Sequence, residues 1–188
     1  MKKVLFAILF ISGVFITQAQ MKFGAKGGLN LASVKASGGG TTITSSNRTS
    51  IALGAFGNFS LSEKFKIQPE LLYAGFGGVE SGAKFKLDYL AIPVLGQFYV
   101  AKKLYLQAGP QLGILLSAKQ EGVDAKEYIR STDLQLLFGG GFYVTKKFSV
   151  DLRYGLSMGN IYSAKAVSVS DVTGKNRAIN ITLGYSFN

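Results

Sequence analysis

The sequence predicts an all-β fold, specifically an eight-stranded antiparallel up-and-down transmembrane β-barrel. Three observations lead to this prediction. Apolar residues alternate with small or polar residues along almost the whole chain, which is the period of a β-strand. The alternating segments run for about 10 to 14 residues, whereas strands of soluble proteins usually have about 5 or 6. Short and long connections alternate between the segments, as they do in outer-membrane barrels.

Eight segments show the strand pattern, and in seven of them one face is clearly apolar. In order along the chain they are residues 21–32, 50–61, 65–76, 85–99, 104–117, 133–144, 148–159 and 178–187. The fourth segment, 85–99, is apolar on both faces, so its register stays open. The apolar faces of the other seven contain, in turn, Leu29, Ile51, Leu71, Leu112, Leu136, Leu152 and Ile181.

The connections predict that the tight turns gather at one rim. Those at 62–64, 101–103 and 145–147 are short, whereas 34–49, 77–84, 118–132 and 162–177 are longer. Because the strand number is even, both termini belong to the rim with the short turns. The stretch 34–49 is rich in Gly, Ser and Thr, and we expect it to be a mobile loop.

Two further features favour a barrel with its apolar face toward lipid. The polar face of the segments is rich in glycine, which weakens a water-facing strand but suits the crowded interior of an eight-stranded barrel. Aromatic residues recur near segment ends, as in the girdles at the two membrane interfaces. The aromatic residues assigned to the girdles are Phe23, Phe59, Tyr73, Phe85, Tyr99, Tyr105, Phe142, Phe148, Tyr185 and Phe187.

The N-terminus has the three parts of a secretory signal peptide. Two lysines precede an apolar run over 4–16, and small and polar residues follow, with cleavage fitting best after Ala19. The alternative, a membrane anchor, is disfavoured because thirteen helical residues span about 20 Å of a hydrocarbon core about 30 Å thick. We therefore expect a signal peptide at 1–19 and one barrel domain at 20–188, located in the cell outer membrane.

Composition excludes several classes of enzyme. The 188 residues include neither Cys nor His, so there is no thiolate nucleophile, no Ser-His-Asp triad and no imidazole metal ligand. We predict no catalytic residue, cofactor or metal site. The formal net charge is +11, yet the basic residues fall mostly at the rims, where lysine can reach lipid head groups. This distribution does not favour nucleic acid as a partner.

Four charged residues fall on the predicted lumen face. They are Glu70, Asp133, Asp151 and Arg153. An unpaired ion in a narrow, packed interior is costly, so we expect Arg153 to bond Glu70 or Asp151. The preferred interpretation is a structural network that fills the lumen; a proton path or a carboxylate pair for acid-base chemistry is the alternative.

Several short motifs resemble those of a small outer-membrane β-barrel domain family that includes PorT-like proteins. They are QPELLY at 68–73, YLAIPV at 89–94, AGP at 108–110 and RYG at 153–155. The resemblance covers 21–188, although Ala91 stands where a glutamate is expected. It implies an outer-membrane location and recognition of an aromatic C-terminal strand by the barrel-assembly machinery. Here that signal would be Tyr185 and Phe187, with Asn188 following.

The resulting prediction is a monomeric, non-enzymatic outer-membrane barrel with a side-chain-filled lumen that acts through its long extracellular loops or rim contacts. Outer-membrane lipids are the expected partners. The cations at the loop end either form an ordinary solvated rim, which is the preferred interpretation, or contact lipopolysaccharide phosphates. One alternative is a PorT-like component of a secretion or transport assembly. Another is a soluble secreted barrel that binds an apolar ligand inside.

Overall fold

The computed structural model describes residues 21–80, 82–163 and 172–187, and most of them are in β-strands. Within these ranges, no helix has the length and apolar character needed to cross a membrane. The signal peptide predicted at 1–19 lies outside the described residues. The eight long strands are β1 (Met21–Gly38), β3 (Ser46–Ser60), β4 (Phe65–Glu80), β5 (Ala83–Tyr99), β6 (Leu104–Gln120), β8 (Thr132–Tyr143), β9 (Phe148–Ser157) and β10 (Thr173–Ser186).

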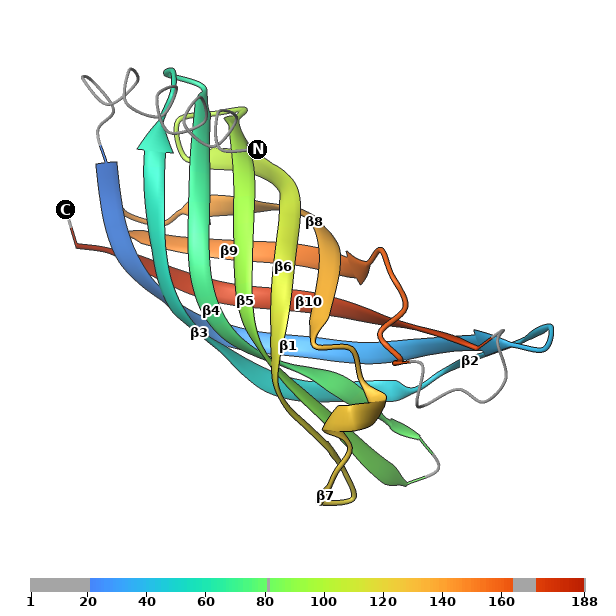
Figure 1. Ribbon diagram of the computed structural model, residues 1–188. Coiled ribbons are helices and arrows are strands. Elements are labelled where there is room, and N and C mark those ends of the chain that lie inside the picture. Colours follow the sequence, from blue (N-terminus) through green and yellow to red (C-terminus); the bar gives the residue numbers. More distant parts are fainter. Residues whose placement is uncertain (1–20, 81, 164–171, 188) are drawn as a thin grey trace, which may run out of the picture.

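The eight long strands form a closed antiparallel barrel. Each pairs with the next long strand along the chain, and β10 returns to pair with β1 from Gly24–Ser186 to Ser37–Thr173. Figure 1 shows the strands curving around one interior. In hydrocarbon an unpaired strand edge would leave backbone groups unsatisfied, and closure removes that edge. The predicted eight-stranded up-and-down topology is confirmed.

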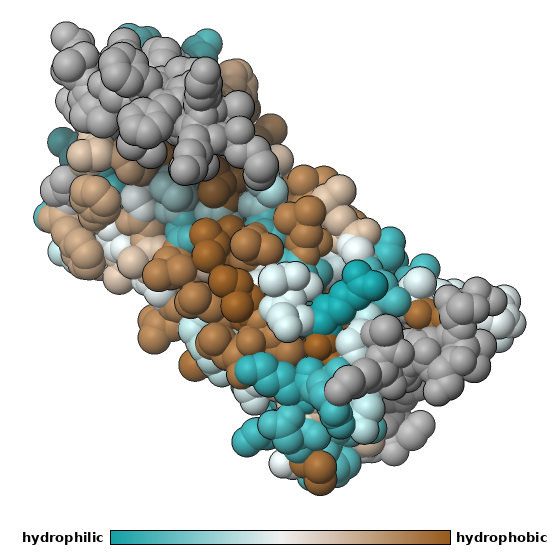
Figure 2. Space-filling model, in the orientation of Figure 1, coloured by the Kyte–Doolittle hydropathy of each residue, from teal (hydrophilic) through white to brown (hydrophobic). Residues whose placement is uncertain are grey.

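The apolar face of the barrel points outward. Leu53 on β3 is 59% exposed and Leu183 on β10 is 62% exposed, whereas Lys26 on β1 is 2% exposed. On β5 the outward apolar positions extend from Leu90 to Phe98, followed by Val100 just beyond the strand. At about 3.3 Å per residue and a tilt of about 40°, this run covers about 25 Å, the height of the apolar band of outer-membrane barrels. Figure 2 shows hydrophobic residues across the middle of the visible face.

The register of β5, which the sequence leaves open, is set by an apolar layer inside the barrel. Leu87, Tyr89 and Ala91 point inward, are buried and belong to this layer. One half of the lumen is therefore filled largely by apolar side chains, in addition to the glycines and charged residues that the sequence places inside. The apolar layer also includes Ala32, Val34, Ala52, Leu72, Ala74, Phe76, Leu115, Ala118, Ile129, Ile161 and Ala178.

The two ends of the barrel differ, and we call them the turn end and the loop end. The turn end carries the four-residue connections 61–64, 100–103 and 144–147. The loop end carries the remaining connections together with the short elements β2 (Thr41–Thr44), β7 (Val123–Asp124) and the 3-10 helix η1 (Lys126–Tyr128). Hydrophilic side chains dominate the lower right of Figure 2, the end at which β2 and β7 lie in Figure 1.

The stretch 34–49, predicted to be a mobile loop, is mostly strand. β1 continues to Gly38 and pairs with β2, so that Gly38 faces Thr41 across a two-residue turn. The turn residues Gly39 and Gly40 have φ of 56° and 77°, and a tight hairpin of this kind needs positive φ at both positions. The connection expected over 77–84 is likewise shorter, because β4 continues to Glu80 and β5 begins at Ala83.

Candidate functional site

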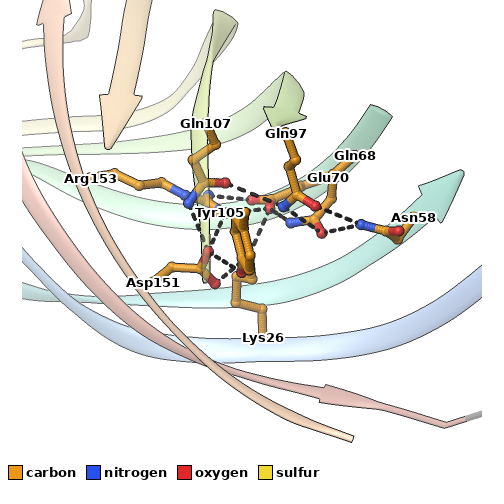
Figure 3. Close-up of polar contacts among 9 residues, drawn as sticks. All are labelled: Lys26, Asn58, Gln68, Glu70, Gln97, Tyr105, Gln107, Asp151 and Arg153. Atoms are coloured by element: carbon orange, nitrogen blue, oxygen red, sulfur yellow. Dashed lines mark hydrogen bonds and ion pairs between the residues drawn. The ribbon is translucent and has the colours of Figure 1, made fainter. Parts of the chain in front are cut away.

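The polar half of the lumen, toward the turn end, contains a buried network of charged side chains. Alternation along β9 points Asp151 and Arg153 inward, while β4 supplies Glu70 and β1 supplies Lys26. All four side chains are at most 2% exposed. Figure 3 shows them converging from different walls of the barrel.

Glu70 is the centre of this network. Arg153 donates from Nη1 to Oε2 and from Nη2 to Oε1 of Glu70, both at 2.7 Å. Lys26 Nζ donates to Glu70 Oε1 at 2.8 Å and lies 3.0 Å from Asp151 Oδ2. The Arg153 guanidinium is also 3.6 Å from Asp151 Oδ1. Two cations thus face two carboxylates and the cluster is neutral, which is the condition for burying ions.

Neutral side chains donate further hydrogen bonds to the two carboxylates. The Tyr105 hydroxyl and Gln107 Nε2 donate to Asp151 Oδ1 at 2.8 Å and 2.7 Å, and Gln68 Nε2 donates to Glu70 Oε1 at 2.6 Å. Gln97 and Asn58 extend the chain of amide hydrogen bonds beyond Gln68 (Figure 3). The network therefore spans the lumen as a continuous hydrogen-bonded layer.

Two lumen glycines make room for rings beside the network. A Cβ on Gly24 would lie 2.5 Å from Phe56 Cζ, and one on Gly141 would lie 2.4 Å from the Tyr105 hydroxyl oxygen. Such separations are too short for non-bonded atoms, so these glycines are required by the packing of the neighbouring rings. Phe56 in turn lies under Lys26, with Nζ 5.2 Å from the ring centroid.

Asp133 lies apart from this network. Its Oδ2 accepts hydrogen bonds from Gln135 Nε2 at 2.7 Å, Ser157 Oγ at 2.7 Å and Asn176 Nδ2 at 2.9 Å. No cation pairs with it among the residues that the structure describes. The sequence reasoning, which required an ionic partner for every lumen charge, therefore did not allow for three neutral donors on one carboxylate.

Three of the four predicted lumen residues therefore come together, and Lys26 was missed. The sequence did indicate an inward position for this residue, because alternation places Lys26 on the glycine-rich face of the first segment. Tyr105 was also misassigned: together with Tyr99 it was expected in an aromatic girdle, but both rings are buried in the lumen. Leu104 and Leu106 point outward, so strict alternation would have placed Tyr105 inward.

The predicted assembly residues lie on the outer surface at the turn end. Tyr185 is 38% exposed and Phe187 is 58% exposed. Their ring centroids lie 5.9 Å apart, and Phe148 lies 4.9 Å from Tyr185. Recognition by the assembly machinery stays a prediction.

The described lumen holds little free space between its two layers. A cavity of about 20 Å³ lies beside Asn30, Leu72 and Arg153, which is room for about one water molecule. No group of three or more acidic, Cys or His side chains in the described residues is arranged to hold a metal ion. The arrangement suits a braced, closed interior.

Comparison with known proteins agrees with this architecture. The chain is similar in structure to Neisserial surface protein A, with a TM-score of 0.54 at 15% identity, covering 90% of this chain and 99% of that protein. It is also similar to the attachment invasion locus protein of Yersinia pestis, with a TM-score of 0.51 at 16% identity, covering 88% and 98%. Comparison with curated proteins found no match.

Most of this amino-acid sequence also matches the sequence pattern of a known protein family. The match, to the outer membrane protein beta-barrel domain, covers residues 18–163. It agrees with the closed barrel and with the lipid-facing apolar surface, and it excludes the soluble secreted barrel considered above. The chain belongs to the outer membrane protein beta-barrel domain family and resides in the cell outer membrane.

Proposed function

We propose that this protein is a non-enzymatic outer-membrane barrel that passes no solute through its lumen and acts through its surfaces. In this proposal the loop end faces the cell exterior and the turn end faces the periplasm, the usual arrangement of such barrels. The observation that supports it most is the double closure of the lumen. The neutral network around Glu70 and the apolar layer around Leu87 lie one after the other along the barrel, and the cavity lined by residues of both holds about 20 Å³.

Conductance tests the closed lumen directly. Purified protein reconstituted into planar bilayers should give no stable current steps, while a general porin reconstituted in the same way provides the positive control. Stable current steps from the wild-type protein whose size changes in Arg153→Leu would show that ions pass the network, and they would refute the proposal.

For the outer surface, we propose contact with lipopolysaccharide phosphates at the loop end. A hollow of about 350 Å³ there is lined by residues that include Arg48, Lys84 and Lys86. Lys84 and Lys86 are exposed on the outward face of β5, beyond the apolar positions that begin at Leu90. Arg48 is oriented by an ion pair of 3.6 Å with Asp88 and by a hydrogen bond to the Phe76 carbonyl. Cations at this height meet the phosphate-bearing head groups of the outer leaflet.

Binding of lipopolysaccharide micelles to the detergent-solubilised protein tests this contact. The variant K84Q/K86Q should bind more weakly than wild type, and dephosphorylated lipopolysaccharide should show little difference between the two proteins. The matched control, K64Q/K147Q, removes two lysines at the turn end and should bind as wild type does. Equal loss in both variants would indicate a general charge effect and contradict a site at the loop end.

A further inference from the structure

A pocket of about 230 Å³ opens at the turn end of the barrel, on the opposite side of the network from the apolar layer. Five lysines line it: Lys22 from β1, Lys66 from β4, Lys102 and Lys103 from one turn and Lys146 from another. No carboxylate of the described residues lines this pocket, and Glu63 in the neighbouring turn lies outside its lining. Lysines from four separate segments of the chain therefore share one concave site.

Two of these lysines point into the mouth of the lumen. Lys22 lies four residues before Lys26 on β1, and Lys66 lies four residues before Glu70 on β4, so each shares the inward face of its strand. Lys66 Nζ lies 4.5 Å from the centroid of the Tyr99 ring, a cation–π contact that orients the ammonium without neutralising it. Lys22 lies close enough to repel Lys66.

The charge of this pocket is uncompensated. Within the described part of the chain, the ion pairs involve Lys26, Arg48 and Arg153 and none of the five pocket lysines. The nearby buried network cannot supply a counter-charge, because its two cations already balance its two carboxylates. Clustered like charges repel one another, and a bound anion would relieve that repulsion.

We propose that this pocket binds a multiply charged phosphate-type anion. Lysine ammonium groups are compact donors suited to phosphate oxygens, and a concave site with low-dielectric walls concentrates their field. A free phosphate compound and a phospholipid head group share this chemistry. The geometry points to the aqueous source, because Lys22 and Lys66 face the lumen axis rather than the surrounding lipid.

The first experiment is calorimetric titration of the full barrel, purified in a zwitterionic detergent, with inorganic pyrophosphate. We expect saturable binding that weakens as sodium chloride is added. The variant K22Q/K66Q should bind about tenfold more weakly or worse, since it removes the two inward charges. The control K119Q/K175Q lowers the net charge equally by removing two exposed lysines at the loop end that line neither this pocket nor the hollow at Lys84, and it should bind as wild type does. Heat-modifiable mobility shows whether each variant is folded.

A second titration distinguishes the two sources. Mixed micelles containing phosphatidylglycerol are compared with micelles containing phosphatidylcholine. Pyrophosphate binding that K22Q/K66Q abolishes, with no preference for phosphatidylglycerol, supports a soluble anion. A preference for phosphatidylglycerol that the same variant removes, without pyrophosphate binding, supports the phosphate site and assigns it to a lipid head group. If neither probe binds, or if K22Q/K66Q binds both as well as folded wild type, the proposal is overturned.

Discussion

Arg153 and Glu70 join opposite walls of the barrel through two parallel hydrogen bonds of 2.7 Å. Arg153 lies on β9 and Glu70 on β4, and the strand order β10-β9-β8-β6-β5-β4-β3-β1 closes from β1 to β10. Counted in either direction, the two strands are four steps apart around the eight long strands of the described chain. The pair therefore braces the barrel across its diameter, in a lumen too narrow to leave such charges in bulk water.

Removing the cation of this brace should strongly destabilise the barrel. Arg153→Leu leaves Lys26 to balance both Glu70 and Asp151, so one buried negative charge is uncompensated. Breaking a buried ion pair in this way typically costs about 3–5 kcal/mol. The free energy of unfolding in detergent, measured by urea titration, should fall accordingly.

The matched control for that variant is the neighbouring residue on the outward face. Leu152 is 56% exposed, so Leu152→Ala removes lipid-facing surface and leaves the network intact. We expect a loss of about 1 kcal/mol or less, as for a surface substitution. If Arg153→Leu costs no more than Leu152→Ala, the inward network does not brace the fold.

Restoring charge balance should recover part of the lost stability. In the double variant Arg153→Leu with Glu70→Gln, Lys26 and Asp151 remain as a single pair whose charged atoms lie 3.0 Å apart. Because the uncompensated charge is gone, the double variant should be more stable than Arg153→Leu alone. Urea titration of the wild type, both single variants and the double variant measures the coupling. Simple addition of the two single losses would show that charge balance is not the stabilising feature.

Much of this architecture could be predicted from alternation, because one face of most strands meets lipid and the other meets a packed lumen. The segment 85–99 resisted prediction for a physical reason. At Leu87 and Tyr89 the lumen itself is apolar, so both faces of β5 carry similar side chains. Periodicity then contains no information on which face points inward.

The site was predicted only in part, because alternation specifies a face but not a neighbour. Glu70 and Arg153 are 83 positions apart in the sequence, and their contact depends on the barrel closing with β4 opposite β9. Tyr105 was assigned to a girdle by its residue type, although alternation places it inward. Alternation placed Lys26 on the inward face, but the predicted ion network did not include it. The loop 34–49 was misjudged because strand pairing continues past the apolar band, where composition resembles that of a linker.

The ring of Tyr105 should be sensitive to any added volume at Gly141. A Cβ there would lie 2.4 Å from both Cζ and the hydroxyl oxygen of Tyr105, whose hydroxyl donates to Asp151 at 2.8 Å. We expect Gly141→Ala to displace the ring, weaken this hydrogen bond and cost about 1–3 kcal/mol. Urea titration of the refolded barrel measures the loss.

The control for this substitution is Gly159→Ala, because a Cβ on Gly159 has nothing within 4 Å. It should leave the free energy of unfolding nearly unchanged. Equal urea midpoints of unfolding for Gly141→Ala and Gly159→Ala would mean that the barrel accommodates the added methyl group. The position of Tyr105 would then not be fixed by packing.

Phe187 should matter for assembly more than for the stability of the finished barrel. Its ring is 58% exposed on the outer surface, and its backbone N–H donates to the Phe23 carbonyl at 2.9 Å, a bond that alanine keeps. Phe187→Ala should therefore reduce the amount of barrel recovered in outer-membrane fractions of cells, while the purified variant refolds in detergent with a near-normal urea midpoint. Phe142→Ala removes another outward aromatic ring, 44% exposed, and should be recovered normally. If both variants are recovered from the outer membrane in wild-type amounts, Phe187 is not part of an assembly signal. If both are reduced equally, any lipid-facing aromatic ring has the same effect on assembly.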